Sequence, residues 1–187
     1  MPVTRIIAVR HGETAWNVDT RIQGQLDIGL NDRGLWQAER VGKALAEESI
    51  DRIYSSDLQR AHTTAQAIAR HAANPTAHEV QLHTGLRERS FGTFEGETWA
   101  DIAEKWPDES RRWKQRDPHF APPGGETPTQ LLARVQATGG GYQDHLLVAN
   151  GFADSGDRFP GEGFHAPGAL AAADVEEKVL EHGPPPG

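Results

Sequence analysis

Residues 4–17 read Thr4-Arg-Ile-Ile-Ala-Val-Arg-His-Gly-Glu-Thr-Ala-Trp-Asn17, a short apolar run that ends in three residues of different chemistry. The Ile and Val residues within 4–9 predict a buried strand. Arg10 then supplies a permanent planar cation that suits phosphate oxygens. His11 supplies an imidazole that is largely neutral at pH 7 and can act as a nucleophile. Because Gly12 lets the backbone approach a bound group closely, the stretch indicates an anion site at the end of a strand.

Beyond this stretch, apolar residues recur alternately with the spacing of helices and of strands. The spacing predicts helices over 32–48, after residue 57, over 97–115 with a break at Pro107, over 127–135 and over 169–180, and strands at 53–54, 79–83 and 145–149. This alternation argues for an α/β layered domain with a mostly parallel sheet. Active sites in such sheets lie beyond the carboxyl ends of the strands, where His11 stands.

Caps and apolar stripes define the first two long helices. Asn31 is expected to cap the helix over 32–48, and Ser56 or Asp57 the next one. The expected buried stripes are Leu35, Ala38, Val41 and Leu45 in the first helix and Leu58, Ala61, Ala65 and Ile68 in the second. Each stripe follows the three- and four-residue spacing of one helix face, which is typical of a helix with one apolar side.

Five segments, taken in chain order, resemble the histidine phosphatase superfamily, the phosphoglycerate-mutase-like enzymes. They are Arg10-His-Gly-Glu-Thr14 with Asn17, Gln23-Gly24 and Asp27; Tyr54-Ser-Ser-Asp-Leu-Gln-Arg-Ala61 with Thr64-Ala65; Leu86-Arg-Glu-Arg89; Phe91-Gly-Thr-Phe-Glu-Gly96; and Pro123-Gly-Gly-Glu-Thr127. The resemblance extends from residue 4 to about residue 135. It implies a phosphoglycerate-mutase-like, three-layer α/β/α sandwich and phosphoryl transfer through a phosphohistidine, with no cofactor.

The same resemblance implies individual roles. His11 would attack phosphorus, and Glu88 would act as the acid and base at the leaving oxygen. The residues expected to bind the substrate are Arg10, Asn17, Gln23, Gly24, Arg60 and Asn150. Arg10 and Arg60 would clamp the phosphate and stabilise the charge on the transferring oxygens.

Each of these residues also has a simpler interpretation. Glu88 could be a solvated charge in a mixed-charge loop, and Asn17 a turn residue. Arg60 could pair on the helix surface with Asp57, three positions earlier. If Glu88 is the acid, its neighbours Arg87 and Arg89 would hold it ionised, so burial or a bound phosphate must raise its pKa.

The resemblance breaks after residue 135. The family brings a second histidine to the phosphate at the end of a later strand, and here Asn150 follows the strand and precedes Gly151. Residues 136–187 hold eight acidic and two basic residues, with 10 of the 20 glycines and 5 of the 12 prolines. We therefore expect a catalytic domain over 1–150 and an atypical tail over 151–187, and a shifted reading frame would explain the change of composition.

Length and composition limit the number of domains, the kinds of metal site and the classes of partner. At 187 residues the chain suits one domain. Without cysteine it has no disulfides or thiolate metal sites, and its nine histidines have no metal-ligand spacing. A net charge of −8 argues against nucleic acid and anionic membranes as partners. With no leader and no long apolar run, a cytoplasmic monomer or homodimer is expected.

The leading hypothesis is a metal-independent phosphatase that hydrolyses a small phosphomonoester. The short segment between Glu88 and Gly124 is more typical of the phosphatase branch than of the mutases, which carry longer insertions. Two alternatives stay open. One is a phosphoglycerate mutase, and the other is a catalytically impaired phosphate-binding pseudoenzyme, which the Asn at position 150 favours.

Overall fold

A five-stranded, mostly parallel sheet forms the centre of the computed structural model, which describes residues 4–138, 145–149 and 175–180. The strands are β1 (Thr4–Arg10), β2 (Arg52–Ser55), β3 (Val80–Leu82), β4 (His145–Ala149) and β5 (Val175–Leu180), in the spatial order β3-β2-β4-β1-β5. Only the β1–β5 pair is antiparallel. The expected α/β class with a mostly parallel sheet is therefore confirmed.

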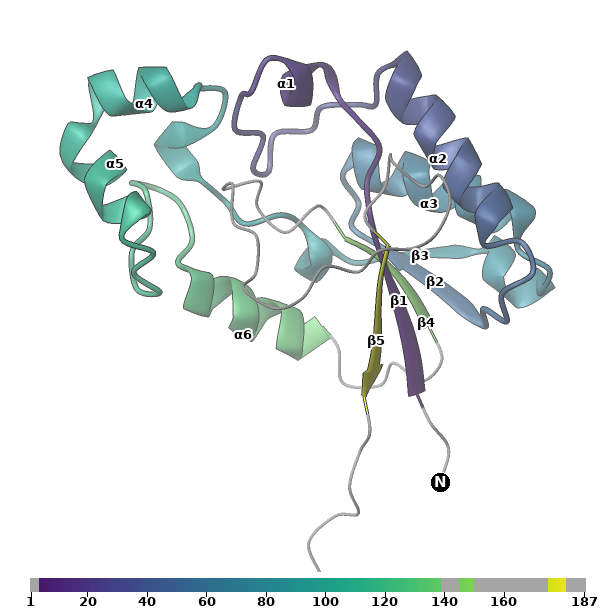
Figure 1. Cartoon of the computed structure of the whole chain (residues 1–187). Helices are drawn as coiled ribbons and strands as arrows, with labels where there is room; N and C mark the ends of the chain where they lie inside the picture. The colour runs from purple at the N-terminus through teal and green to yellow at the C-terminus, as the bar shows by residue number, and fades with distance from the viewer. Residues whose placement is uncertain (1–3, 139–144, 150–174, 181–187) are drawn as a thin grey trace, which may run out of the picture.

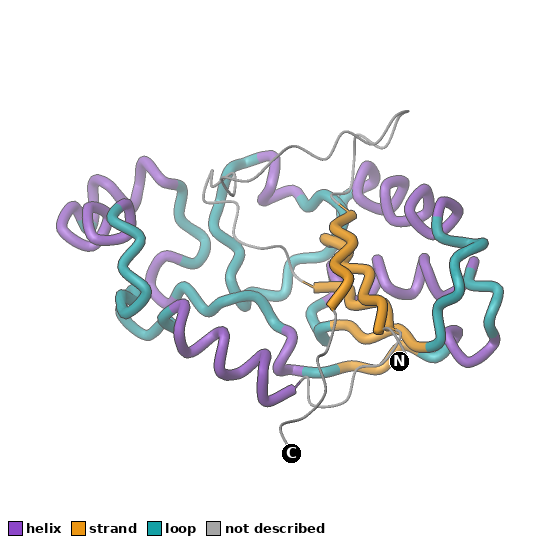
Figure 2. Tube along the Cα trace, turned by 60° about the horizontal axis from the view of Figure 1, so that its bottom comes forward, coloured by secondary structure: helices purple, strands orange, loops and turns teal. Residues whose placement is uncertain are grey.

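Helices lie on both sides of the strands in the two ribbon views (Figures 1 and 2). The helices are α1 (Ala15–Val18), α2 (Asp32–Ala44), α3 (Gln59–His71), α4 (Trp99–Lys105), α5 (Pro107–Lys114) and α6 (Pro128–Thr138), and the short 3-10 turns are η1 (Pro75–His78), η2 (Thr84–Leu86) and η3 (Gly92–Phe94). Helix α3 packs on β2, β3 and β4, and α2 packs on α3. The group α4–α6 lies on the opposite side of the strands.

The main core fills the space between the sheet and the α2–α3 pair. It is built from buried aliphatic residues that include Ile7 and Val9 of β1, Ile53 of β2 and Ile68 of α3. The expected stripe of α3 is buried throughout, whereas Leu35 of α2 is 48 % exposed. Gly34, Gln37, Ala38 and Val41 form the buried face of α2 instead. One residue of the expected stripe was therefore assigned to the wrong face.

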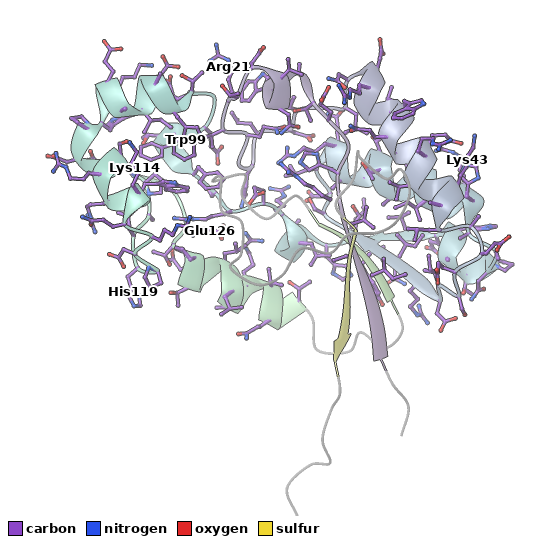
Figure 3. The ribbon with its side chains drawn as sticks, viewed as in Figure 1. Arg21, Lys43, Trp99, Lys114, His119 and Glu126 are labelled. Atoms are coloured by element: carbon purple, nitrogen blue, oxygen red, sulfur yellow. The ribbon has the colours of Figure 1, made fainter. Side chains whose placement is uncertain are left out.

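A second, smaller core explains the Trp-rich segment. Phe94 and Ile102 are fully buried, and Trp99, Trp106 and Trp113 pack around them. The expected break at Pro107 separates α4 from α5, where proline occupies the first turn of the new helix. Figure 3 shows Trp99 in this region, near α4 and α5.

The helix caps agree with the sequence at α2 but not at α3. Asn31 caps α2 by accepting a hydrogen bond from the Gly34 N–H at 2.8 Å. The first residue of α3, Gln59, donates its N–H to the Asp27 carboxylate at 2.7 Å. Ser56 and Asp57 do not cap this helix, because the cap comes from a loop 32 residues earlier that lies across its N-terminus.

The prediction of a helix over 169–180 is wrong for residues 175–180. Residues 175–180 form β5, which pairs antiparallel with β1 from Thr4↔Leu180 to Val9↔Val175. Strand β1 has β4 on its other side, so β5 satisfies the N–H and C=O groups that would otherwise lie on an open sheet edge. Tertiary pairing thus overrides the helical pattern of this segment.

Candidate active site

The candidate site lies at the carboxyl end of β1. In the parallel β1–β4 pair Arg10 is opposite Ala149, and in the β2–β4 pair Ser55 is opposite Val148, so the three strands end at the same edge. Ser55 and Ser56 at the end of β2 are fully buried beside this edge. His11 follows β1 directly and is placed where parallel sheets form their sites.

His11 is held in one tautomer. Its side chain is buried, with 8 % of its surface exposed, and Nδ1 lies 2.7 Å from the carbonyl oxygen of Gly12. Because a carbonyl can only accept, Nδ1 carries the hydrogen and Nε2 presents its lone pair. Burial is the main cause that lowers the pKa of His11 to about 3, and the charges of Arg60 and Arg10 add to it, whereas the hydrogen bond to Gly12 opposes it. The imidazole is therefore neutral at neutral pH, with the Nε2 lone pair available.

Gly12 is required by packing against α2. A Cβ atom at this position would lie 2.4 Å from the carbonyl oxygen of Gly34, which is closer than real Cβ contacts. Its N–H donates to the Thr64 hydroxyl at 3.1 Å, and that hydroxyl donates in turn to the Arg60 carbonyl at 2.8 Å. The glycine thus lets the nucleophile loop lie against two helices.

Arg60 projects from the first turn of α3 and is only 1 % exposed. One terminal nitrogen donates to the Gly24 carbonyl at 2.7 Å and the other to the Leu26 carbonyl at 2.8 Å. Its Nε–H is buried and has no hydrogen-bond partner within the described part of the chain. Asp57 pairs with Arg87 instead, so the simpler interpretation of Arg60 as a surface ion pair is wrong.

Glu88 has the properties of a general acid. Burial raises the pKa of Glu88 to about 8, although the Arg89 N–H, at 2.7 Å from Oε1, and the charges of Arg60, Arg10 and Arg134 act in the opposite direction. Of its two cationic neighbours, Arg87 binds the Asp57 carboxylate through two nitrogens. Arg89 donates to the carbonyls of Glu126 and Phe120. Both guanidiniums are thus engaged elsewhere, and burial leaves the Glu88 carboxyl mostly protonated at neutral pH.

The charges of the four central residues act on one another. Arg60 and Arg10 lower the pKa of His11, and the same two arginines oppose the rise in the pKa of Glu88. Arg10 is half-buried at the end of β1. A neutral histidine, a protonated carboxyl and two permanent cations make a site that attracts an anion and can pass a proton to a leaving group.

The remaining expected site residues that the structure describes are tied by hydrogen bonds to Thr14 or to Arg60. The amide oxygen of Asn17 accepts from the Thr14 N–H at 2.9 Å, which closes a capping box at α1. Gln23 Oε1 accepts from the Thr14 hydroxyl at 3.0 Å. Gly24 has a φ of +53° and turns its carbonyl toward Arg60. Asn150 lies outside the described residues.

Three contributors were not predicted from the sequence. The Thr64 hydroxyl accepts a hydrogen bond from the Gly12 N–H. Arg134 of α6 donates to the Glu88 carbonyl and also to the Glu126 carboxylate. Glu126 and Thr64 both lie in segments that resemble the superfamily, Glu126 after Gly124-Gly125, but neither was assigned a role. Arg134 had no sequence signal, since an arginine on an amphipathic helix is ordinarily a surface residue.

Within the described part of the chain, no group of three or more His, Asp or Glu side chains is placed so that it could hold a metal ion. No helix there has the length and apolar character required to cross a membrane.

Comparison with known proteins gives consistent matches over the first three quarters of the chain. A sequence profile described as the histidine phosphatase superfamily (branch 1) matches residues 6–144. A metal-independent phosphoserine phosphatase of Arabidopsis thaliana is 44 % identical over 137 residues, covering 71 % of this chain and 55 % of that protein. A glucosyl-3-phosphoglycerate phosphatase of Mycolicibacterium vanbaalenii is 37 % identical over 134 residues, covering 72 % and 57 %.

Solved structures agree. A mycobacterial glucosyl-3-phosphoglycerate phosphatase in complex with VO3 superimposes with a TM-score of 0.68 at 32 % identity, covering 79 % of this chain and 75 % of that one. The expected phosphoglycerate-mutase-like α/β architecture is therefore confirmed. The chain spans slightly more than half the length of the curated relatives it matches.

Proposed function

Because this chain belongs to the histidine phosphatase superfamily, we propose that it hydrolyses a small phosphomonoester through a phosphohistidine formed on His11. The observation that carries the proposal is the pair of displaced pKa values, about 3 for His11 and about 8 for Glu88. Between these values the nucleophile is unprotonated while the acid holds its proton, so both groups are ready for the same step.

In the first step the His11 Nε2 lone pair attacks phosphorus in line with the ester oxygen. The P–O bond breaks, and the leaving oxygen takes the proton of Glu88, so the product departs as a neutral alcohol. The buried Nε–H of Arg60 and the guanidinium of Arg10 stabilise the negative charge on the non-bridging oxygens. His11 is left as a phosphohistidine.

In the second step water attacks the phosphohistidine. Glu88, now a carboxylate, removes a proton from the water as the new P–O bond forms. The P–N bond breaks, Nε2 regains its lone pair, and inorganic phosphate leaves. The protein returns to its starting state without a metal ion, and no redox change occurs.

The substrate class follows from the relatives, which are named as phosphatases of phosphoserine and of glucosyl-3-phosphoglycerate. We propose that Asn17, Gln23 and Gly24 contact the substrate, and Asn150 would donate one hydrogen bond to a phosphoryl oxygen. We assign residues 1–150 to the catalytic domain and treat 151–187 as a separate tail.

A second function is favoured by one observation, the asparagine at position 150 where a second histidine would add a charge or a proton. A phosphate-binding protein with little turnover would keep Arg10 and Arg60 and bind phosphate without hydrolysing esters. Binding and hydrolysis therefore have to be measured separately.

The test is hydrolysis of p-nitrophenyl phosphate in EDTA by the wild-type chain and by His11→Ala. Turnover that survives EDTA and is lost in the variant supports the proposal, and acid-labile 32P label on the wild-type chain alone supports the phosphohistidine. Vanadate binding by a folded wild-type chain without turnover would instead favour the phosphate-binding protein.

A further inference from the structure

Arg134 is the only residue of α6 that reaches the Glu88 loop with a charged group among the contacts the structure describes. Its guanidinium donates to three backbone carbonyls within residues 85–88: to Gly85 at 2.8 Å, to Arg87 at 3.1 Å and to Glu88 at 3.2 Å. Two further nitrogen–oxygen contacts of 2.8 Å join it to both carboxylate oxygens of Glu126. All five contacts use the planar fork that only arginine offers.

Glu126 anchors this fork to the other end of the same loop. Its carboxylate accepts from the Ser90 N–H at 2.9 Å, and its own N–H donates to the Ser90 carbonyl at 2.8 Å. In Figure 3 Glu126 lies between α6 and the α4–α5 helices. Residues 85–90 are thus gripped at both ends by one Arg134–Glu126 pair.

The contacts of Arg134 and Glu126 affect the Glu88 carboxyl through the backbone of the loop. Glu88 Oε1 accepts a hydrogen bond from the Arg89 N–H at 2.7 Å, so the carboxyl is oriented by the backbone next to it. Gln25 donates to the Glu88 carbonyl at 3.1 Å from the substrate-side loop. The orientation of the carboxyl therefore depends on where Arg134 holds the carbonyls of residues 85–88.

We propose that Arg134, braced by Glu126, is a positioning residue that holds the Glu88 carboxyl in its buried, proton-donating orientation. The inference rests on the proposed function for its catalytic meaning. It differs from a purely structural role, in which Arg134 would only attach α6 to the domain and its loss would affect every substrate equally.

Two effects of Arg134 on Glu88 can be separated by Arg134→Lys. The positive charge opposes the rise in the pKa of Glu88 that burial causes, and lysine keeps that charge. Lysine cannot reproduce the five-contact fork, so the loop loses its fixed carbonyls and the carboxyl gains solvent. If position matters, the pKa of Glu88 in Arg134→Lys falls toward the ordinary glutamate range.

The primary experiment is a 13C NMR titration of the full chain labelled at the glutamate side-chain carboxyl, with Glu88→Gln to assign the resonance. We expect the Glu88 midpoint to fall by about 1–2 pH units in Arg134→Lys. Arg111→Lys is the matched control, because Arg111 is an exposed arginine on α5 that pairs with Asp108, three residues earlier. An unchanged midpoint in Arg134→Lys would overturn the inference.

The second readout is the dependence of kcat/KM on the leaving group, because kcat/KM covers the steps up to the phosphohistidine and excludes the hydrolysis step that all substrates share. Phenyl phosphate needs a proton on its leaving oxygen, whereas 2,4-dinitrophenyl phosphate does not. We expect Arg134→Lys to lose about tenfold to a hundredfold in kcat/KM on the first substrate and little on the second. Equal losses on both substrates would overturn the positioning role.

If Arg134→Lys does not fold, Glu126→Gln tests the same contact while keeping Arg134. We expect the Glu88 midpoint to fall in this variant too, by a smaller amount. An unchanged midpoint would count against the inference. The titration needs no turnover, so the two proposals fail separately. If the wild-type chain is inactive but the Glu88 midpoint shifts in Arg134→Lys, only the phosphatase function is contradicted. If the wild-type chain is active but the midpoint does not shift, only the role of Arg134 is contradicted.

Discussion

Replacing His11 with glutamine should make the protein less sensitive to acid. The folded state holds the imidazole neutral, with a pKa of about 3, while the unfolded chain has the ordinary value of 6.5. Between these values the unfolded state binds one proton more than the folded state, so lowering the pH favours unfolding. Glutamine has a similar size and does not titrate, so this contribution disappears in His11→Gln.

The magnitude follows from the shift itself. His11 stabilises the folded state fully above pH 6.5 in its neutral form, and this contribution is lost as the pH falls toward 3. One pKa unit corresponds to about 1.4 kcal/mol, so between pH 8 and pH 4.5 the wild type should lose about 2–3 kcal/mol relative to His11→Gln. The other titratable groups do not enter this difference, because they titrate in both proteins and cancel.

The assay is urea unfolding followed by tryptophan fluorescence at pH 8, 6.5, 5.5 and 4.5. With a slope near 2 kcal/mol per molar urea, the difference between the two midpoints should change by about 1–1.5 M across this range. His119→Gln is the control, because His119 is exposed at the surface (Figure 3). A wild-type-minus-variant difference that stays constant with pH would refute the reasoning, since His11 would then not be buried in its neutral form.

Three further predictions concern the site and its packing. Wild-type hydrolysis of phenyl phosphate should decline above about pH 8 as Glu88 loses its proton, and Glu88→Gln should be about 10²–10⁴-fold slower with no such decline in its pH–rate profile. Gly12→Ala should lower the free energy of unfolding by about 1–3 kcal/mol in urea titrations, because its Cβ would lie 2.4 Å from the Gly34 oxygen. Gly29→Ala, whose Cβ would meet only Gln59 Oε1 at 3.7 Å, should be close to neutral. Asn150→His should raise kcat by about a hundredfold to a thousandfold if a second cationic donor is what the site lacks, and an unchanged rate would show that another group does this work.

The reading-frame hypothesis has a separate check. The sequence profile match ends at residue 144, near the point where the composition changes. If the tail arose from a shifted frame, an alternative frame of the encoding DNA past codon 135 should restore an apolar strand, a His-Gly pair and a helix. Absence of such a frame would remove the hypothesis.

Local patterns predicted four of the five described strands and most helices. The apolar run before Arg10, the caps of α2, and the proline between α4 and α5 each specify backbone geometry through the residues themselves. Segment 175–180 was predicted wrongly, because its helical pattern is overridden by pairing with the edge of β1. A single sequence does not show which edge is open.

The sequence by itself determined the α/β class, the family resemblance and the identity of the candidate nucleophile, His11, because these depend on periodicity and on an ordered set of short motifs. Only the tertiary structure decided the protonation of His11 and Glu88, since burial and the arginine charges around them are properties of packing. It also decided that Arg87 pairs with Asp57, that Asp27 caps α3, and that Arg134 grips the Glu88 loop. These contacts join residues about 30 to 46 positions apart, and a one-dimensional pattern does not encode which distant partner a side chain will meet.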